Sequence, residues 1–231
     1  MKKHLCEQGS LQWLELRAGI VTASEADSLV SPKFRIRTGE TPRTLLATKL
    51  AEKWCGPLPS FGAWATEQGH LLEDLAIPAY ELETGESVER VGFITRDDGR
   101  CGCSPDGLLP NCGLEIKSLQ PVRHIKCLLD GGLPEDYAGQ VHFSMLVTGF
   151  DRWKLFLYSR RLPHMMLTIE RDEEIQETLN EALDAFLTDF DIAWERLCDK
   201  NGGPPPPRYP TVLTPESQAD PRADMFQGIT P

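Results

Sequence analysis

A chain of 231 residues is long enough to bury one α/β core, or two very small ones. Its 40% apolar and 26% charged residues are ordinary for a soluble globular protein. No apolar run reaches roughly 18 residues, and polar residues interrupt the start of the chain, which excludes a transmembrane span and a secretory signal. We therefore expect a cytoplasmic protein that does not act at a membrane.

The net charge of −11 is unevenly spread along the chain. Residues 170–199 hold eleven acidic side chains against two arginines, a local net charge of −9. Residues 31–60 hold six basic side chains against two glutamates, a local net charge of +4. An acidic protein can still present a basic face to phosphates, although a solvated surface is the simpler interpretation of such charge runs.

Seven cysteines are present, of which Cys101, Cys103 and Cys112 lie close together in the sequence. A zinc or iron–sulphur site would need short-spaced pairs that the sequence lacks. The pattern favours reduced thiols, several of them buried.

The first half of the chain is predicted to be mainly helical. Apolar spacing predicts a helix, a turn and a second helix over residues 11–30, a helix over 43–54 and a long helix over 64–84. Thr22 or Ser24 is expected to cap the second of these helices, and Pro78 is expected to bend the long one.

Strands and helices alternate in the second half. Period-2 patterns predict strands over residues 88–95, 114–117, 153–159 and 165–170. Helical spacing predicts helices over residues 121–129, 134–148 and 172–199. This alternation predicts an α/β fold with a central mixed β-sheet flanked by helices. We expect one domain, residues 1–200, and a Pro-rich C-terminal tail, residues 201–231, that is extended or disordered.

A short hairpin carries the most informative side chains. Asp106 lies in a Pro-Asp-Gly turn, and a turn near Asn111 precedes the short strand that holds Glu115 and Lys117. Because residues i and i+2 share one face of a strand, the hairpin is expected to gather two carboxylates and one ammonium. Two carboxylates suit a hard cation such as magnesium, which polarises a phosphate oxygen and acidifies a water molecule. An adjacent lysine can orient that water or stabilise the growing negative charge.

On its own this spacing is a weak signal, since an exposed hairpin salt bridge would look the same. Two details strengthen it. Leu114 and Ile116 give the acidic and basic pair an apolar setting, so a buried pair would need compensation such as a metal ion. Asp106 lies in a loop, and loops often place functional groups.

Four motifs extend the pattern over most of the chain. They are WLELRAGIVTAS (13–24), GHLLEDLA (69–76), SPDGL with LEIK (104–108 and 114–117), and YAGQVHFSM (137–145). In these motifs, their order and their spacing, the sequence resembles the lambda exonuclease family, also called the YqaJ-type viral recombinase family, within the PD-(D/E)xK nuclease superfamily. The resemblance implies a restriction-endonuclease-like core.

The resemblance also implies a role for individual residues. It assigns Asp106 and Glu115 as metal ligands, with the carbonyl of Ile116 as a third ligand. It also assigns Lys117 to activate or position the attacking water. The remaining implied residues are the two that line the site from neighbouring helices, Glu73 and Gln140; the four that bind the 5′-phosphate, Arg17, Ser24, Ser104 and Arg123; and a further outer carboxylate, Asp97.

The activity implied by the resemblance is a magnesium-dependent 5′→3′ double-strand exonuclease. It would digest one strand from a 5′-phosphorylated end and leave 3′ single-stranded overhangs for recombination by annealing. Two Mg²⁺ ions are implied, with Mn²⁺ as a substitute, together with double-stranded DNA ends, a ring-shaped homotrimer and a single-strand annealing protein as partners. In such a ring the acidic helix would face outward and residues 31–53 would face the DNA. Trp64 is a candidate wedge for the terminal base pair.

Two alternatives remain open from the sequence. One is another nuclease of the same fold, either an endonuclease or a Cas4-like enzyme with an iron–sulphur cluster. The other is a DNA-binding module that keeps the fold without catalysis. The presence of Asp106, Glu115, Lys117, Glu73 and Gln140 argues against the second.

Overall fold

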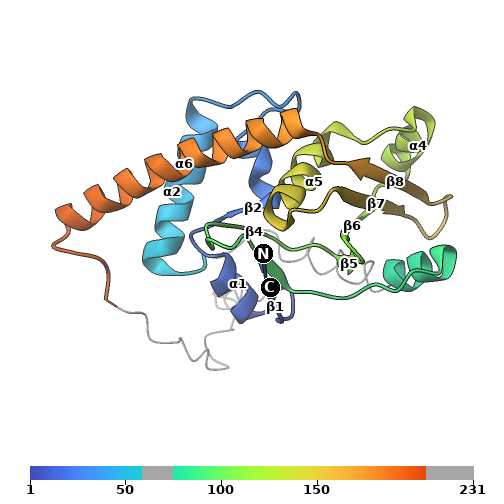
Figure 1. Cartoon of the computed structure of the whole chain (residues 1–231), viewed down its shortest axis with the longest axis horizontal. Helices are drawn as coiled ribbons and strands as arrows, with labels where there is room; N and C mark the ends of the chain where they lie inside the picture. Colours follow the sequence, from blue (N-terminus) through green and yellow to red (C-terminus); the bar gives the residue numbers. More distant parts are fainter. Residues whose placement is uncertain (59–74, 207–231) are drawn as a thin grey trace, which may run out of the picture.

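The structure is a computed structural model that describes residues 1–58 and 75–206 (Figure 1). Its strands are β1 (Lys2–His4), β2 (Val21–Thr22), β3 (Phe93–Thr95), β4 (Cys101–Cys103), β5 (Gly107–Leu109), β6 (Cys112–Ser118), β7 (Arg152–Tyr158) and β8 (Met165–Glu170). Its helices are α1 (Leu11–Arg17), the 3₁₀ helix η1 (Ala23–Ser28), α2 (Glu40–Cys55), a helix over residues 75–84, α4 (Pro121–Asp130), α5 (Glu135–Thr148) and α6 (Glu173–Lys200).

The strands form two four-stranded sheets, with the orders β1-β3-β4-β2 and β5-β6-β7-β8. Each sheet is mixed, because β2 runs parallel to β4 and β6 runs parallel to β7, while the other neighbours are antiparallel. Helix α5 contacts strands of both sheets. The predicted mixed α/β architecture with flanking helices is confirmed, with the strands divided between two sheets.

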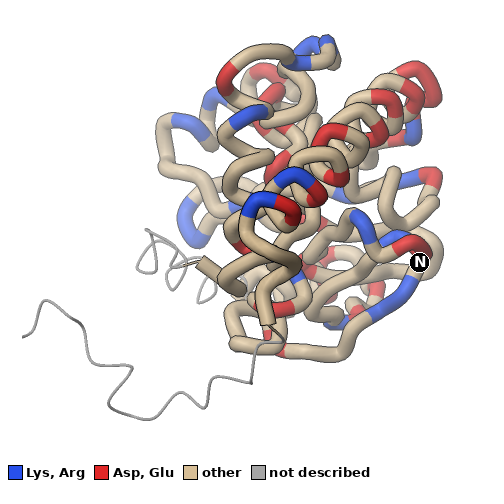
Figure 2. Tube along the Cα trace, turned by 90° about the vertical axis from the view of Figure 1, so that its left-hand side faces the viewer, with Lys and Arg blue, Asp and Glu red and all other residues tan. Residues whose placement is uncertain are grey.

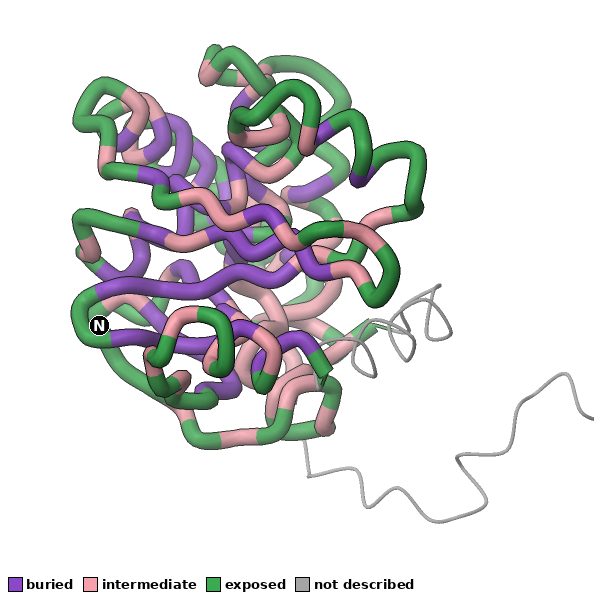
Figure 3. Tube along the Cα trace, turned by 90° about the vertical axis from the view of Figure 1, so that its right-hand side faces the viewer, coloured by how far each residue is buried: buried purple, intermediate pink, exposed green. Residues whose placement is uncertain are grey.

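The interior lies between the sheets and the helices that cover them (Figure 3). Helix α5 contributes Phe143 and α6 contributes Leu179 and Leu183, all fully buried. Burying a side chain of this size contributes roughly 1.5–3 kcal/mol. The predicted helix over 172–199 therefore corresponds to α6, whose apolar stripe packs on α5 and α2.

Two predicted elements differ from the structure, and one observed strand was not predicted. The second helix of residues 11–30 is the short 3₁₀ helix η1, which ends at Ser28 because Val30 pairs with Ile36 in an isolated β-bridge. The strand predicted over 88–95 shortens to β3, since Glu89 instead pairs with Leu108 of the other sheet. Strand β1, which the sequence did not predict, pairs antiparallel with β3.

The basic and acidic segments lie side by side, because α2 packs against α6, along which acidic residues recur (Figure 2). Lys49 of α2 is only 3% exposed and pairs with Glu25 and Glu52 at 2.7 and 3.0 Å. The ammonium of Lys53 lies 4.3 Å from the ring centroid of Trp194 on α6. The expectation that residues 31–53 as a whole face DNA is therefore wrong for Lys49, which is buried, and the ammonium of half-buried Lys53 lies against α6.

All seven cysteines are free thiols, and the four buried ones are Cys101, Cys103, Cys112 and Cys127. Within residues 1–58 and 75–206, no helix combines the length and apolarity needed to cross a membrane. Helix α6 ends at Lys200. The division into a domain and a tail stays a prediction, because residues 207–231 lie outside the described part of the chain.

The buried side chain of His142 is expected to make the stability of the protein depend on pH. Its ring packs edge-on against Phe34 at 5.4 Å, and burial lowers its pKa below the ordinary value of 6.5. As pH falls through 6.5, the unfolded chain takes up a proton that the folded chain resists, so stability is full above that pH and declines below it. We expect the melting temperature to fall between pH 7 and pH 5, and to fall less in His142→Gln. Equal slopes for the two proteins would contradict this.

Candidate active site

The hairpin of β5 and β6 sets Asp106 opposite Glu115. Its register pairs Gly107 with Leu114, and the backbone N–H of Asp106 donates to the Leu114 carbonyl at 3.1 Å. The turn is closed by Asn111 in the left-handed region at φ 57°, which asparagine tolerates better than most residues.

The two faces of β6 differ in chemistry. Leu114 and Ile116 are buried in an apolar cluster on one face. On the other face the Lys117 ammonium lies 2.6 Å from Glu115 Oε1, and Gln140 Nε2 of α5 donates to the same oxygen at 2.6 Å. The strand alternation predicted for this segment is therefore present, and α5 supplies a contact partner from 25 residues away.

Asp106 joins this group through the backbone. Its Oδ2 accepts a hydrogen bond from the N–H of Ile116 at 2.5 Å, between the two charged residues of β6. The structure thus gathers Asp106, Glu115, Lys117 and Gln140. Glu73, predicted to line the same site, lies outside the described residues, as does Trp64.

The charged side chains of this cluster interact strongly with one another. Glu115 is only 3% exposed, and a buried carboxylate needs compensating partners. Burial lowers the pKa of Lys117, but the charges of Glu115 and Asp106 outweigh it, and the net shift is upward. The ammonium therefore keeps its proton at neutral pH in this arrangement. Such a group can orient a nucleophile or stabilise negative charge, but it cannot accept a proton.

The donor set fits a hard divalent cation. Asp106, Glu115 and the Ile116 carbonyl offer oxygen atoms only, which Mg²⁺ prefers. In the described ranges no three His, Cys, Asp or Glu side chains are grouped so that they could hold a metal ion. The described part of the site contains two carboxylates, Asp106 and Glu115, and the third predicted carboxylate, Glu73, lies outside the described residues.

A second polar cluster begins two residues before Asp106. Ser104 Oγ accepts hydrogen bonds from Trp13 Nε1 at 2.8 Å and from Arg17 Nη1 at 3.2 Å. Arg17 Nη2 also lies 3.5 Å from the hydroxyls of Thr22 and Ser24. Three of the four residues predicted to bind a 5′-phosphate are thus together: Arg17, Ser24 and Ser104.

Arg17 is held in place by an aromatic ring. Its guanidinium carbon lies 4.1 Å from the ring centroid of Trp13, one turn earlier on α1, which is cation–π geometry. Burial lowers the pKa of Arg17 and outweighs the opposing effect of the charges on Glu25 and Glu52, so the net shift is downward. An arginine keeps its charge under such shifts, so the cluster carries a positive centre.

The structure does not bring Arg123 to this cluster. Arg123 forms an ion pair with Asp136, and its guanidinium carbon lies 5.3 Å from the ring centroid of Tyr137. The same ring lies 5.4 Å from the Lys117 ammonium, so Arg123 and Lys117 lie near the same tyrosine. It also lines a hollow of about 610 Å³ at α4 and the start of α5.

Asp97 is likewise not drawn into the hairpin cluster. It pairs with the N-terminal amine of Met1 at 2.8 Å, and its side chain is 81% exposed. The structure therefore does not place Asp97 as an outer carboxylate of the hairpin site.

Sequence reasoning missed the parts played by Trp13 and Tyr137. Trp13 contacts Ser104 and Arg17, two residues of the second polar cluster. Its spacing of four residues from Arg17 on one helix was the available signal, because such residues share a helix face. Tyr137 precedes Gln140 by three residues on α5, so helical spacing would also have placed both near Lys117.

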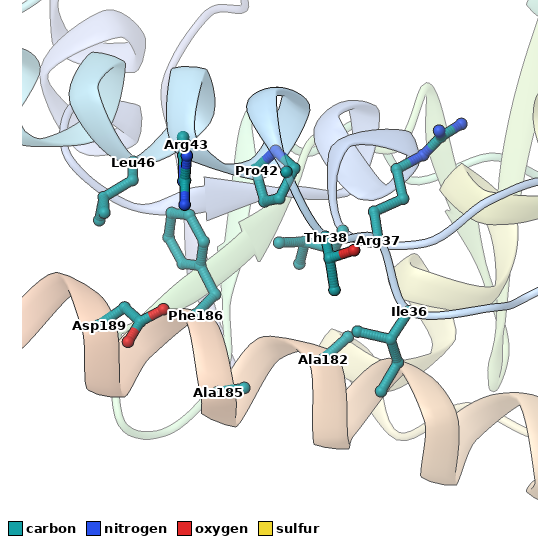
Figure 4. A pocket seen from close by; sticks show the side chains of 12 residues that line it. Ile36, Arg37, Thr38, Pro42, Arg43, Leu46, Ala182, Ala185, Phe186 and Asp189 are labelled. Carbon is teal, nitrogen blue, oxygen red and sulfur yellow. The ribbon is translucent and has the colours of Figure 1, made fainter.

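A separate hollow of about 300 Å³ lies between α2 and α6 (Figure 4). Phe186 and Asp189 of α6 face Arg43 of α2 across it. None of the hairpin residues lines this hollow. Exposed Arg43, expected at a DNA surface, therefore lies beside the acidic helix.

Comparison with solved structures identifies the class of this fold. Two structures of LHK-Exo, the alkaline exonuclease of Laribacter hongkongensis, match at 28% and 27% identity, each with a TM-score of 0.74, over 84% of this chain and 98% of the other. A phage-related exonuclease from Haemophilus somnus 129PT shares the fold at 14% identity, with a TM-score of 0.57 over 77% of this chain and 96% of the other. The fold of this chain is therefore the one seen in these alkaline exonucleases.

The family follows from the domain match. The YqaJ-like viral recombinase domain matches residues 12–151, more than half of the chain, so this protein belongs to the YqaJ-like viral recombinase family. The match includes both the hairpin cluster and the Arg17 cluster. No protein with a curated description matches the chain.

Proposed function

We propose that the protein is a magnesium-dependent exonuclease that digests one strand of duplex DNA in the 5′→3′ direction. It starts at a 5′-phosphorylated end and leaves 3′ single-stranded overhangs for recombination by strand annealing. The supporting observation is the short chain distance between two clusters of different chemistry. Ser104 of the positive cluster and Asp106 of the acidic cluster are two residues apart, so their Cα atoms are at most about 7 Å apart.

This spacing suits a substrate that is held by its end. A terminal phosphate bound by Arg17 and Ser104 would place the first phosphodiester toward Asp106 and Glu115. Arginine forms strong paired hydrogen bonds with phosphate oxygens, and serine donates one. LHK-Exo has been crystallised with dAMP, a single nucleotide, which supports a site built for one nucleotide at a time.

Each residue of the hairpin has a proposed part in the cleavage. Asp106, Glu115 and the Ile116 carbonyl would hold the divalent cation, with Glu73 lining the site. The cation, Mg²⁺ with Mn²⁺ as a substitute and two ions in all, would polarise the phosphate and acidify a water molecule. Lys117 orients the nucleophile and stabilises negative charge on the phosphate. Gln140 fixes the orientation of the Glu115 carboxylate, since both it and Lys117 contact the same oxygen.

The assembly and partners are proposed from the family. A homotrimer that encircles DNA and a single-strand annealing protein as its partner follow from membership alone. Arg123 is proposed as a phosphate contact only if DNA displaces it from Asp136. Sedimentation of the purified protein at several concentrations measures the oligomeric state directly.

The activity and its polarity are tested on linear duplexes labelled at either end. With magnesium, we expect loss of the 5′ label first, faster digestion of 5′-phosphorylated ends than of 5′-hydroxyl ends, and no cleavage of closed circular DNA. Arg17→Ala is expected to reduce the preference for phosphorylated ends by at least about tenfold, because a charged hydrogen bond contributes roughly 1.5–3 kcal/mol.

Other outcomes would select the alternatives. Comparable cleavage of closed circles would favour an endonuclease of the same fold. DNA binding without cleavage in Mg²⁺ or Mn²⁺ would favour a non-catalytic module. Release of the 3′ label first would reverse the proposed polarity.

A further inference from the structure

Two hydrogen bonds fix the direction in which the Ser104 hydroxyl can donate. A serine oxygen has two acceptor positions and one proton. Trp13 Nε1, which can only donate, and Arg17 Nη1 both donate to Ser104 Oγ, at 2.8 and 3.2 Å. Both acceptor positions are thereby used, so the proton is directed to a third group that accepts. The adjacent guanidinium makes an anion the favoured acceptor.

The hydroxyl of Ser24 is used differently. Thr22 Oγ1 donates to Glu25 Oε2 at 2.9 Å, because a carboxylate can only accept. Thr22 Oγ1 lies 3.1 Å from Ser24 Oγ, and since the proton of Thr22 is already donated, Ser24 is the donor of that bond. The proton of Ser24 is therefore used inside the cluster, whereas that of Ser104 points to an incoming ligand.

Trp13 also restrains the second donor of the cluster. Its ring lies against the guanidinium of Arg17, with 4.1 Å between the arginine carbon and the ring centroid. A side chain that is ordered before binding loses less entropy when the ligand arrives. The indole thus orders Arg17 through its face and Ser104 through its N–H.

We propose that Trp13 is a positioning residue that presents Ser104 and Arg17 as a preformed pair of donors to the terminal phosphate of a DNA strand. This inference rests on the proposed function, which supplies that phosphate. Trp13 does not contact the reacting atoms. Its effect is on the recognition of the strand end rather than on cleavage itself.

The test is Trp13→Phe, which keeps an aromatic face for Arg17 and removes the N–H donor. We measure kcat/KM on duplexes that differ only in a 5′-phosphate or 5′-hydroxyl end. The variant is expected to lower the preference for phosphate about fivefold, the effect of one hydrogen bond, because its loss of rate on phosphate ends exceeds any loss on hydroxyl ends. The control is Trp54→Phe, the same substitution at the contact with Trp194 on α6, which should leave the preference unchanged.

A double-mutant cycle separates positioning from packing. If Trp13 acts through Ser104, then Trp13→Phe should not lower the preference further when Ser104→Ala is already present. Equal losses on both kinds of end would show packing alone and would overturn the proposal. Should Trp13→Phe be unfolded by circular dichroism, Trp13→Tyr, which also lacks the ring N–H, provides the same comparison.

Different results would contradict the proposed function and the role of Trp13. If the unmodified protein digests both ends equally, the phosphate site of the proposed function is wrong and the inference falls with it. If the unmodified protein prefers phosphate and Trp13→Phe retains the full preference, only the role of Trp13 is wrong.

Discussion

Replacing Glu115 with glutamine is expected to lower the rate of DNA digestion in magnesium by at least about a hundredfold. Glu115 is the most buried charge of the hairpin, and Lys117 and Gln140 both contact its Oε1. Glutamine keeps the shape of the side chain but removes the negative charge. The substitution therefore removes one proposed metal ligand and the anion that orients Lys117. The measurement is single-turnover digestion of a 5′-phosphorylated duplex, with Mg²⁺ affinity measured by calorimetry.

Two comparisons show whether the effect belongs to the site. Glu177→Gln, the same substitution at an exposed position of α6, should leave digestion unchanged. Gln140→Ala should cause a smaller loss, about tenfold to a hundredfold, since Gln140 acts by orienting Glu115. Near-normal digestion by a folded Glu115→Gln protein would remove the hairpin from the mechanism, and with it the proposed function.

Gly113→Ala is expected to lower the free energy of unfolding by about 3 kcal/mol. A Cβ at Gly113 would lie 2.3 Å from ring atoms of Trp153, which stands opposite it in the parallel register of β6 and β7. Trp153 is fully buried, so its ring has no open space to move into. Thermal unfolding measures the loss, and a decrease in melting temperature of about 6–12 °C corresponds to it.

The matched control is Gly132→Ala, in the loop between α4 and α5, where nothing lies within 4 Å of the added carbon. It should change stability by less than about 1 kcal/mol in either direction. Because Gly113 is two residues from Glu115 on the same strand, the folded fraction of Gly113→Ala should also digest DNA more slowly. Equal stability of the two variants would show that β6 and β7 are not packed as described.

Local sequence determined most of the hairpin. Period-2 alternation put Glu115 and Lys117 on one face of a strand, and the turn at Asn111 returned the chain to Asp106. The long helix α6 was predicted almost to its ends, because its apolar stripe repeats over 28 residues. Elements of two or three residues, such as β1 and β2, carry too few positions for a pattern, and tertiary pairing alone defines them.

The family motifs named the residues of both clusters, but only the tertiary structure decided which of them meet. Trp13 reaches Ser104 across 91 positions of sequence, and the basic Lys49 turned out to be buried between two glutamates. Arg123, which the resemblance assigned by spacing outside the four motifs, lies instead beside Asp136. The physical reason is that periodicity fixes the face of an element on which a side chain lies, whereas its partner depends on how distant elements pack against that face.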